Sequence, residues 1–450
     1  MPTPASVTTK IARFVNNLKW EDLPIAVQDR ARDRFIDAVS TGIAGRDIDV
    51  SQVVRKATSG TGGGPCSSFV DNETRQAGDA ALVNGTALHS ILYEDINAKS
   101  SDHPGPVMVP ACLAVAEEMA AAGRPATIKD LLTGIVVGYE VQLALGRVMA
   151  RSVVDRGLRT TSLFGCVAAA AAAAKVYRLN EAQTMGALNM GANFAFGILE
   201  GIALTGHEMY VHAGMAGRTG IMAARMGEAA VVSTPLTFEG PLGYFNAFGP
   251  CIEEFTIGDD WRIMNIWCKP YPLSGGKIRG VDAGVAAWQA GVRPENIKNV
   301  KVRMSPRTIA YPGADWRGPF TRFTQAQNST QFCISAALLG RDMAAVDTFT
   351  KGFGDAEVAS FMQKVDLVGE PERIATGAEQ LDIEMNDGTV RSFEVEWADS
   401  RVATVEKMVK KLRLLSRDFW PADNVDKLAA AITGPVDRPI GDVTAILRRR

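Results

Sequence analysis

Four histidines supply the side chains best suited to proton transfer near neutral pH. All four lie in segments marked by glycine, proline or asparagine rather than within apolar helices: His89, His103, His207 and His212. Three carboxylates, Glu94, Asp95 and Asp102, stand between the first two histidines. A histidine beside a carboxylate is a common general acid or base. A structural hydrogen bond is the commoner role for a single histidine, so both interpretations stay open.

Helical periodicity dominates roughly the first half of the chain, where these residues lie. Apolar residues recur at helical spacing in two early segments: Ile11, Phe14, Val15 and Leu18, then Ala31, Phe35, Ile36, Val39 and Ile43. Alanine-rich stretches follow, including the run from Ala168 to Ala174. Small residues let helix axes approach closely, so we expect a dense bundle with this run in its packing.

The pattern changes near Cys268. The stretch KPYPLSGGKIRG is a loop rich in proline and glycine, and IKNVKVRMSP alternates like a strand. Asp387 and Gly388 join two further alternating runs, which is a strong hairpin signal. The sequence therefore predicts a large all-α domain over residues 1–265 and a smaller α+β domain over residues 266–404. Residues 405–450 return to helical periodicity and are expected to pack back on the first domain.

Composition excludes several classes of partner. The 48 Lys and Arg residues balance 50 Asp and Glu, so no basic field exists to hold nucleic acid or an anionic membrane. The six cysteines are scattered without CxxC spacing, which indicates a reducing compartment and no zinc site. The N-terminus has no apolar stretch of signal-peptide length, and the alanine run ends at Lys175, too early to span a bilayer. We expect a cytoplasmic protein.

Several segments resemble the MmgE/PrpD family, which includes 2-methylcitrate dehydratase, cis-aconitate decarboxylase and iminodisuccinate epimerase. The segments that carry the resemblance are LPIAVQDRARDRFIDAVSTGIAGRD, NGTALHSILYED with the later HPG, RGLRTTSLFGCVAAAAAAAKV, HAGMAGRTGIMAARM and CKPYPLSGGK. The resemblance implies that the α+β domain is a lid over an active-site cleft. It also implies a homodimer, a small di- or tricarboxylate substrate, and no metal or organic cofactor.

The chain departs from the polar groups that the resemblance implies for lyase members. Five positions carry other residues: Tyr93 for an aspartate, Arg159 for a histidine, Met209 for a lysine, Ser274 for a histidine and Phe332 for a tyrosine. Only His103 and Lys269 clearly remain. Expelling water or carbon dioxide needs an acid or a positive charge at the leaving group, so these losses weaken a lyase interpretation.

Proton abstraction beside a carboxylate, as in an epimerase, needs fewer groups. One group removes the α-proton, positive neighbours stabilise the enolate-like charge, and a second group returns a proton on the opposite face. We predict His103 and Lys269 as the catalytic pair, with Tyr93 as the alternative base.

The remaining candidates bind substrate or hold the loops, and for several both roles stay open. Arg159 offers a bidentate fork that holds a carboxylate in a fixed orientation. Asp95 caps a helix or orients His103, and Asn97 donates to substrate or forms a turn. His89 is expected to be structural. The other predicted substrate-binding residues are Tyr210, His212, Ser274 and Lys277.

The residues and the resemblance together leave three candidate functions. The leading prediction is a cofactor-independent epimerase of an amino- or imino-dicarboxylate such as iminodisuccinate. The alternative is a hydro-lyase of the 2-methylcitrate dehydratase type, in which Ser274, Lys277 or Arg159 assumes the missing acid roles. A third possibility is an inactive family member that serves as a binding protein.

Overall fold

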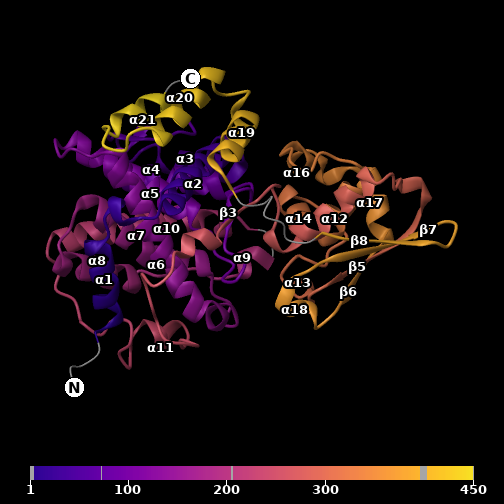
Figure 1. Ribbon diagram of the computed structural model, residues 1–450, viewed down its shortest axis with the longest axis horizontal. Coiled ribbons are helices and arrows are strands. Elements are labelled where there is room, and N and C mark those ends of the chain that lie inside the picture. Colours follow the sequence, from indigo (N-terminus) through magenta and orange to yellow (C-terminus); the bar gives the residue numbers. More distant parts are fainter. Residues whose placement is uncertain (1–4, 72, 204–205, 396–402, 449–450) are drawn as a thin grey trace.

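The protein folds into two bodies joined by a short crossing of the chain (Figure 1). The smaller body, built around the core between Leu273 and Ile383, is named the lid. The computed structural model describes residues 5–71, 73–203, 206–395 and 403–448. One hydrophobic core draws on residues between Val7 and Cys268 and again between Ala403 and Leu447. A separate core lies between Leu273 and Ile383. The domain boundaries expected at residues 265/266 and 404/405 stay predictions.

The larger body is helical, as its periodicity predicts. Its helices before the lid are α1 (Val7–Asn17), α2 (Ile25–Ala44), α3 (Asp49–Thr58), α4 (Ala77–His89), α5 (Gly105–Ala121), α6 (Ile128–Val154), α7 (Thr160–Tyr177), α8 (Glu181–Asn193), α9 (Glu200–Ala203), α10 (Glu208–Glu228) and α11 (Tyr244–Phe248). Four short strands pair antiparallel: β1 (Cys66–Ser67) with β2 (Thr74–Arg75), and β3 (Asp95–Ile96) with β4 (Trp267–Cys268). After the lid come α19 (Val405–Ser416), α20 (Ala422–Thr433) and α21 (Gly441–Leu447).

Helix α7 lies at the centre of this body because its alanines leave room for neighbouring backbones. Residues Ala168 to Ala174 are fully buried, which confirms their predicted packing role. Glycines of three other helices face them: Gly138 of α6, Gly191 of α8 and Gly220 of α10. Small residues on both sides of a contact allow helix axes to approach closely. Helices α6 and α7 are apolar enough to cross a membrane, but most of each lies buried inside this core.

The smaller body is the α+β domain. Its strands are β5 (Ile297–Met304), β6 (Val365–Gly369), β7 (Gln380–Met385) and β8 (Val390–Glu394), in the sheet order β6-β5-β7-β8. The predicted hairpin at Asp387-Gly388 is confirmed, because β7 and β8 pair antiparallel across it and Gly388 has φ 85°. The helices are α12 (Ile278–Gln289), α13 (Pro306–Ile309), α14 (Phe323–Asn328), α15 (Thr330–Leu338), α16 (Asp347–Thr350), α17 (Ala356–Phe361) and α18 (Arg373–Thr376).

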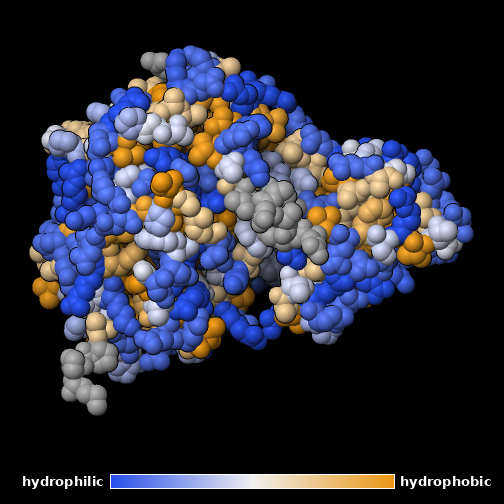
Figure 2. All heavy atoms as spheres, in the orientation of Figure 1, coloured by the Kyte–Doolittle hydropathy of each residue, from blue (hydrophilic) through white to orange (hydrophobic). Residues whose placement is uncertain are grey.

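The two bodies meet beside the paired strands β3 and β4, where the chain passes from the larger body into the smaller one. This paired segment is named the crossing. Figure 2 shows mostly hydrophilic atoms on this face of the molecule, with a recess where the bodies meet. Gln327 of the smaller body donates to the carbonyl of Ile91 in the larger one, at 2.8 Å. Residues that carry the resemblance from both halves of the chain therefore come together at this junction.

Gly220→Ala is expected to destabilise the protein by about 1–3 kcal/mol, the usual cost of forcing a methylene into a packed core. A Cβ atom at this position would lie 2.3 Å from the Cβ of Ala169. Gly441→Ala is the control, because Gly441 begins α21 with nothing within 4 Å of the added methyl group. Thermal unfolding measures both variants. An unchanged midpoint for Gly220→Ala would contradict the close contact between α7 and α10.

Candidate active site

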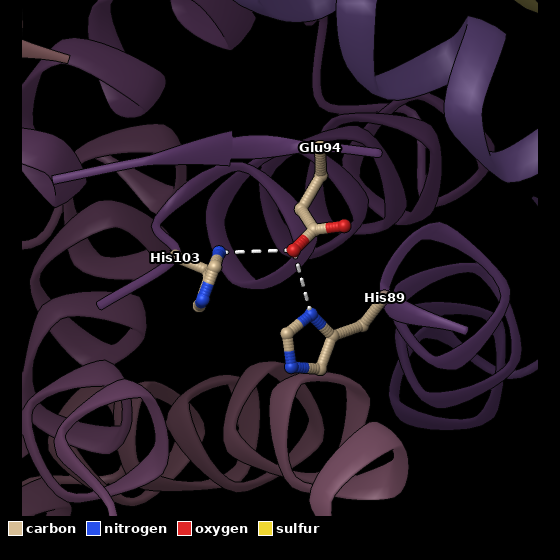
Figure 3. Close-up of side chains that lie close together, drawn as sticks. All are labelled: His89, Glu94 and His103. Atoms are coloured by element: carbon tan, nitrogen blue, oxygen red, sulfur yellow. Dashed lines mark hydrogen bonds and ion pairs between the residues drawn. The ribbon is translucent and has the colours of Figure 1, made fainter. Parts of the chain in front are cut away.

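Glu94 forms the centre of a buried polar cluster at the junction (Figure 3). Its Oε1 atom lies 3.1 Å from the Nζ of Lys269, 2.9 Å from the Nδ1 of His103 and 3.1 Å from the Nδ1 of His89. Lys269 also donates to the carbonyl of Leu92, at 2.8 Å. One carboxylate thus gathers two histidines and the lysine.

The strand register places these residues together. Asp95 pairs with Cys268 in the antiparallel β3–β4 ladder, so their neighbours Glu94 and Lys269 lie opposite each other. His89 is the last residue of α4. His103 follows β3 and directly precedes Pro104, the N-cap of α5. Short elements of the helical domain and the crossing therefore supply the whole cluster.

Burial and the charge of the ion-pair partner act in opposite directions on the pKa of Glu94 and on the pKa of Lys269. Burial would raise the pKa of Glu94, but the Lys269 ammonium and the two histidines outweigh it and hold that pKa well below its ordinary value. Burial lowers the pKa of Lys269, and the Glu94 carboxylate opposes this shift. The carboxylate is therefore ionised, and it supplies the countercharge for a lysine that has left water.

His103 is held as a neutral base. Its Nδ1 lies 2.8 Å from the Asp95 carbonyl, which can only accept, so this nitrogen carries the proton and the lone pair is on Nε2. Burial, followed by the charge of Lys269, lowers the pKa of His103 to about 3, although Glu94 opposes the shift. At neutral pH the imidazole is therefore uncharged, with its lone pair on Nε2.

His89 links Glu94 to Arg159. The Arg159 Nη2 donates to the His89 Nε2 at 3.2 Å, so the proton of neutral His89 sits on Nδ1 and faces Glu94. Burial lowers the pKa of His89, which favours this neutral form. His89, which the sequence predicts to be structural, therefore lies between Glu94 and Arg159 and orients the arginine.

Arg159 places a buried positive charge next to His89. It is buried at the N-cap of α7, and its backbone N–H donates to the carbonyl of Gly197. Within the described parts of the chain, no carboxylate lies within ion-pair distance of its guanidinium. Its Nε atom has no hydrogen-bond partner there either. A buried, unneutralised guanidinium is suited to an incoming carboxylate.

The lid contributes Lys277 and Tyr311. Lys277 is fully buried, donates to Ser274 Oγ at 3.2 Å and lies 5.6 Å from the centre of the Tyr311 ring. Burial lowers the pKa of Lys277 to about 8, although Cys333 and Glu379 oppose the shift. Tyr311 packs against an apolar cluster in the helical domain that includes Leu92. Lys277 therefore lies next to a tyrosine that contacts the helical domain, and its pKa of about 8 lets the amine change charge not far above neutral pH.

Tyr93 has a structural position rather than that of a base. Its hydroxyl donates to the Pro270 carbonyl at 2.9 Å. Burial raises the pKa of Tyr93 well above its ordinary value, so the phenol keeps its proton at neutral pH. We correct the expectation that it is the alternative base, because its proton is already committed to the chain crossing.

The two predicted loop residues hold backbone. Asn97 Oδ1 accepts from the backbone N–H groups of Lys99 and Ser100, which is the turn alternative and leaves that oxygen facing its own loop. Asp95 combines both of its alternatives. Its carboxylate accepts from Gly105 N–H at the start of α5, while its backbone carbonyl orients His103. Both side chains therefore accept hydrogen bonds from backbone N–H groups, and their predicted contact with substrate stays a prediction.

Two predicted substrate-binding residues, Tyr210 and His212, lie at the edge of the cluster, and the substituted position Met209 lies beside them. Tyr210 is buried, with its ring centre 6.0 Å from that of His89. His212 is half-buried, and burial together with Arg159 and His89 lowers its pKa to about 4. Met209 lies in the apolar cluster with Tyr210, so no charge replaces the lysine that the resemblance implies there.

The cluster has the composition of a metal site, since ligand atoms of His89, Glu94 and His103 all lie within 4.8 Å of one another. Lys269 already contacts the shared carboxylate oxygen, and Arg159 contacts the outer nitrogen of His89. A divalent cation would face both fixed positive groups at short range. These contacts favour an ion-pair and proton-transfer network, and the expectation of no metal stays a prediction.

Glu94 is the residue that sequence reasoning passed over. It stands between Tyr93 and Asp95, which were both singled out, and nothing in its own spacing distinguishes it from Asp95. A usable signal is its position next to a strand whose partner strand ends at Cys268, directly before Lys269. That signal exists only once the pairing is known.

Glu94→Gln or Lys269→Met alone is expected to cost about 3–5 kcal/mol, because each leaves an uncompensated charge or an unmatched partner in the interior. The double variant should be less destabilised than the sum of the two by more than about 1 kcal/mol. Denaturant unfolding measures all three. The exposed pair Lys298 and Glu384 is the matched control, with near-additive effects expected. Additive losses at Glu94 and Lys269 would contradict the pairing.

The sequence matches known proteins along most of its length. It is 26% identical over 409 residues to the cis-aconitate decarboxylase-like protein oryM of Aspergillus oryzae, covering 85% of this chain and 84% of that protein. It is 22% identical to a cis-aconitate decarboxylase of Aspergillus terreus, over 98% of this chain and 95% of that protein. It is 24% identical to the Homo sapiens cis-aconitate decarboxylase, over 82% and 78% respectively.

Two family models cover the two halves of the chain. The MmgE/PrpD N-terminal domain matches residues 9–251, and the MmgE/PrpD C-terminal domain matches residues 271–433. The three relatives bear cis-aconitate decarboxylase or decarboxylase-like names, and the predicted epimerase branch is not among them. Since both models match in order, one on each side of the crossing, the protein belongs to the MmgE/PrpD family.

Proposed function

We propose that the protein is a cofactor-independent lyase that acts on a di- or tricarboxylic acid and expels carbon dioxide or water. The observation that carries this proposal is a pair of buried cations from the two domains. Arg159 contacts His89 of the Glu94 cluster, and Lys277 of the lid lies 5.6 Å from the centre of the Tyr311 ring, which packs against the helical domain. Decarboxylase names among the relatives support it. This reverses the order of the sequence-based hypotheses, in which the epimerase came first.

The proposed chemistry divides proton transfer between the two domains. Arg159 binds one carboxylate of the substrate, and the Lys269 ammonium stabilises negative charge that develops beside it. The Nε2 atom of His103 removes a proton, and protonated Lys277 supplies one from the lid side. The sequence paired His103 with Lys269, but two hydrogen bonds of Lys269 are already used within the cluster.

Each expulsion balances with these groups. In decarboxylation the C–CO₂ bond breaks, its electron pair moves to the carbon conjugated with the remaining carboxylate, and Lys277 protonates that carbon. In dehydration His103 removes the α-proton while Lys277 protonates the departing hydroxyl. Lys277 thereby takes a role that the resemblance gives to groups replaced here by Ser274 and Met209.

Epimerisation remains the second candidate for a specific reason. Phe332 and Met209 are buried in apolar clusters at positions where the resemblance implies a tyrosine and a lysine. His103 and Lys277 could then remove and return an α-proton without any leaving group. Iminodisuccinate stays the substrate of that alternative.

Proton NMR in D₂O separates these functions, with cis-aconitate, 2-methylcitrate, citrate and iminodisuccinate as substrates. We expect new olefinic signals with loss of a carboxylate or hydroxyl group from at least one tricarboxylate. Deuterium at the α-position of an intact skeleton would replace the lyase with the epimerase. Complete silence with all four acids would overturn the proposed lyase and favour the binding protein.

We expect kcat/KM to fall as pH rises through about 8, because the free enzyme then loses the proton and charge of Lys277. Lys277→Met should lower kcat by about 10²- to 10⁴-fold, the usual contribution of a general acid. Lys298→Met, on an exposed lid strand, is the control and should leave the rate unchanged. A pH profile that keeps its alkaline limb in Lys277→Met would assign that limb to another group.

A further inference from the structure

Lys411 of α19 contacts the backbone of the crossing next to the Glu94 cluster. Its ammonium donates to Asp37 Oδ1 at 2.7 Å, to the Tyr93 carbonyl at 2.7 Å and to the Lys269 carbonyl at 3.3 Å. An ammonium has three N–H donors, and here three acceptors meet it. Two of the three are backbone carbonyls: one belongs to Lys269, and the other belongs to the residue directly before Glu94.

The surroundings make this a fixed contact. Lys411 is 9% exposed and Asp37 is 2% exposed, so water competes little for these hydrogen bonds. The centre of the Tyr93 ring lies 4.0 Å from the Lys411 Nζ, so an aromatic face also covers the ammonium. Asp37 supplies the countercharge that a buried ammonium requires.

Helix α19 also docks on the helical domain through contacts other than this ammonium. Met408 and Leu412 of the same helix are buried in its core. Arg30 of α2 also donates to the carbonyl of Ala403, where the chain returns from the lid. A methionine at position 411 has nearly the same length and could fill the space, so the charge itself serves the carbonyls at the crossing.

We propose that Lys411 is a positioning residue that sets the separation of the Glu94 and Lys269 backbones and so aligns their ion pair. The proposal rests on the proposed function for its kinetic consequence only. Helix α19 follows the lid in sequence, and Lys269 directly precedes the lid. The contact between Lys411 and the Lys269 carbonyl therefore ties the chain that leaves the lid to the chain that enters it. Asp37 anchors the ammonium from α2.

The test compares Lys411→Met with Lys410→Met, a control on the exposed side of the same helix, where the lysine side chain is 74% exposed. We expect Lys411→Met to lower kcat about tenfold or more, since a small misplacement of reacting groups has effects of this order. KM should change less than about twofold, because Arg159 and Lys277 are left in place. Lys410→Met should match the unaltered protein.

Amide hydrogen exchange followed by mass spectrometry supplies a readout that needs no substrate. Segments 93–96 and 267–269 should exchange about tenfold faster or more in Lys411→Met, with α7 and α10 unchanged. Faster exchange throughout α2 and α19 with unchanged kcat would assign Lys411 to general stability and overturn the proposal. Unaltered exchange at both segments would overturn it as well.

Asp37→Asn provides a second variant if Lys411→Met does not fold. It keeps the shape of the side chain but removes the countercharge, so the same two segments should exchange faster by a smaller factor. Unchanged exchange in a folded Asp37→Asn protein would overturn the proposal. If the unaltered protein shows no activity on the four acids, the proposed function fails, while exchange at the two segments still decides whether Lys411 holds the crossing.

Discussion

Both the connection between the two domains and the arrangement of the candidate site depend on the buried ion pair between Lys269 and Glu94. It lies where the chain passes from the helical domain into the lid, next to the pairing of Asp95 with Cys268. A buried pair of this kind is stable only when both partners keep their geometry, since either charge alone is costly in the interior. The requirement that holds the crossing together therefore also fixes the position of a lysine next to two histidines.

Neutral histidines follow from the same constraint. Burial lowers the pKa of His103 and of His89, and the carbonyl of Asp95 and the guanidinium of Arg159 select the tautomer of each ring. One ring keeps an open acceptor nitrogen, and the other holds an arginine. Charge in the cluster is thus carried by the lysine, the glutamate and the arginine, while both imidazoles are neutral.

The structure shows what each residue does at the positions where the chain departs from the polar groups that the family resemblance implies. Met209 and Phe332 became part of apolar packing, and Tyr93 became a hydrogen-bond donor at the crossing. Arg159 retained a polar role and gained a fork that suits a carboxylate. Under the proposed function, chemistry in this member depends on fewer side chains than the family resemblance implies, and on Lys277 from the lid.

The sequence by itself determined the helices, the lid hairpin and the family, because periodicity, the Asp387-Gly388 turn and the long motifs are local signals. It also predicted His103, Lys269 and Arg159 from their motif positions, and the structure brings these three around Glu94 and His89. Only the tertiary structure decided that Glu94 is the shared carboxylate, that Tyr93 is structural and that Lys411 reaches the crossing. The physical reason is that these roles depend on contacts between segments far apart in sequence, such as residues 93–94 with 269 and 411, which no local pattern encodes.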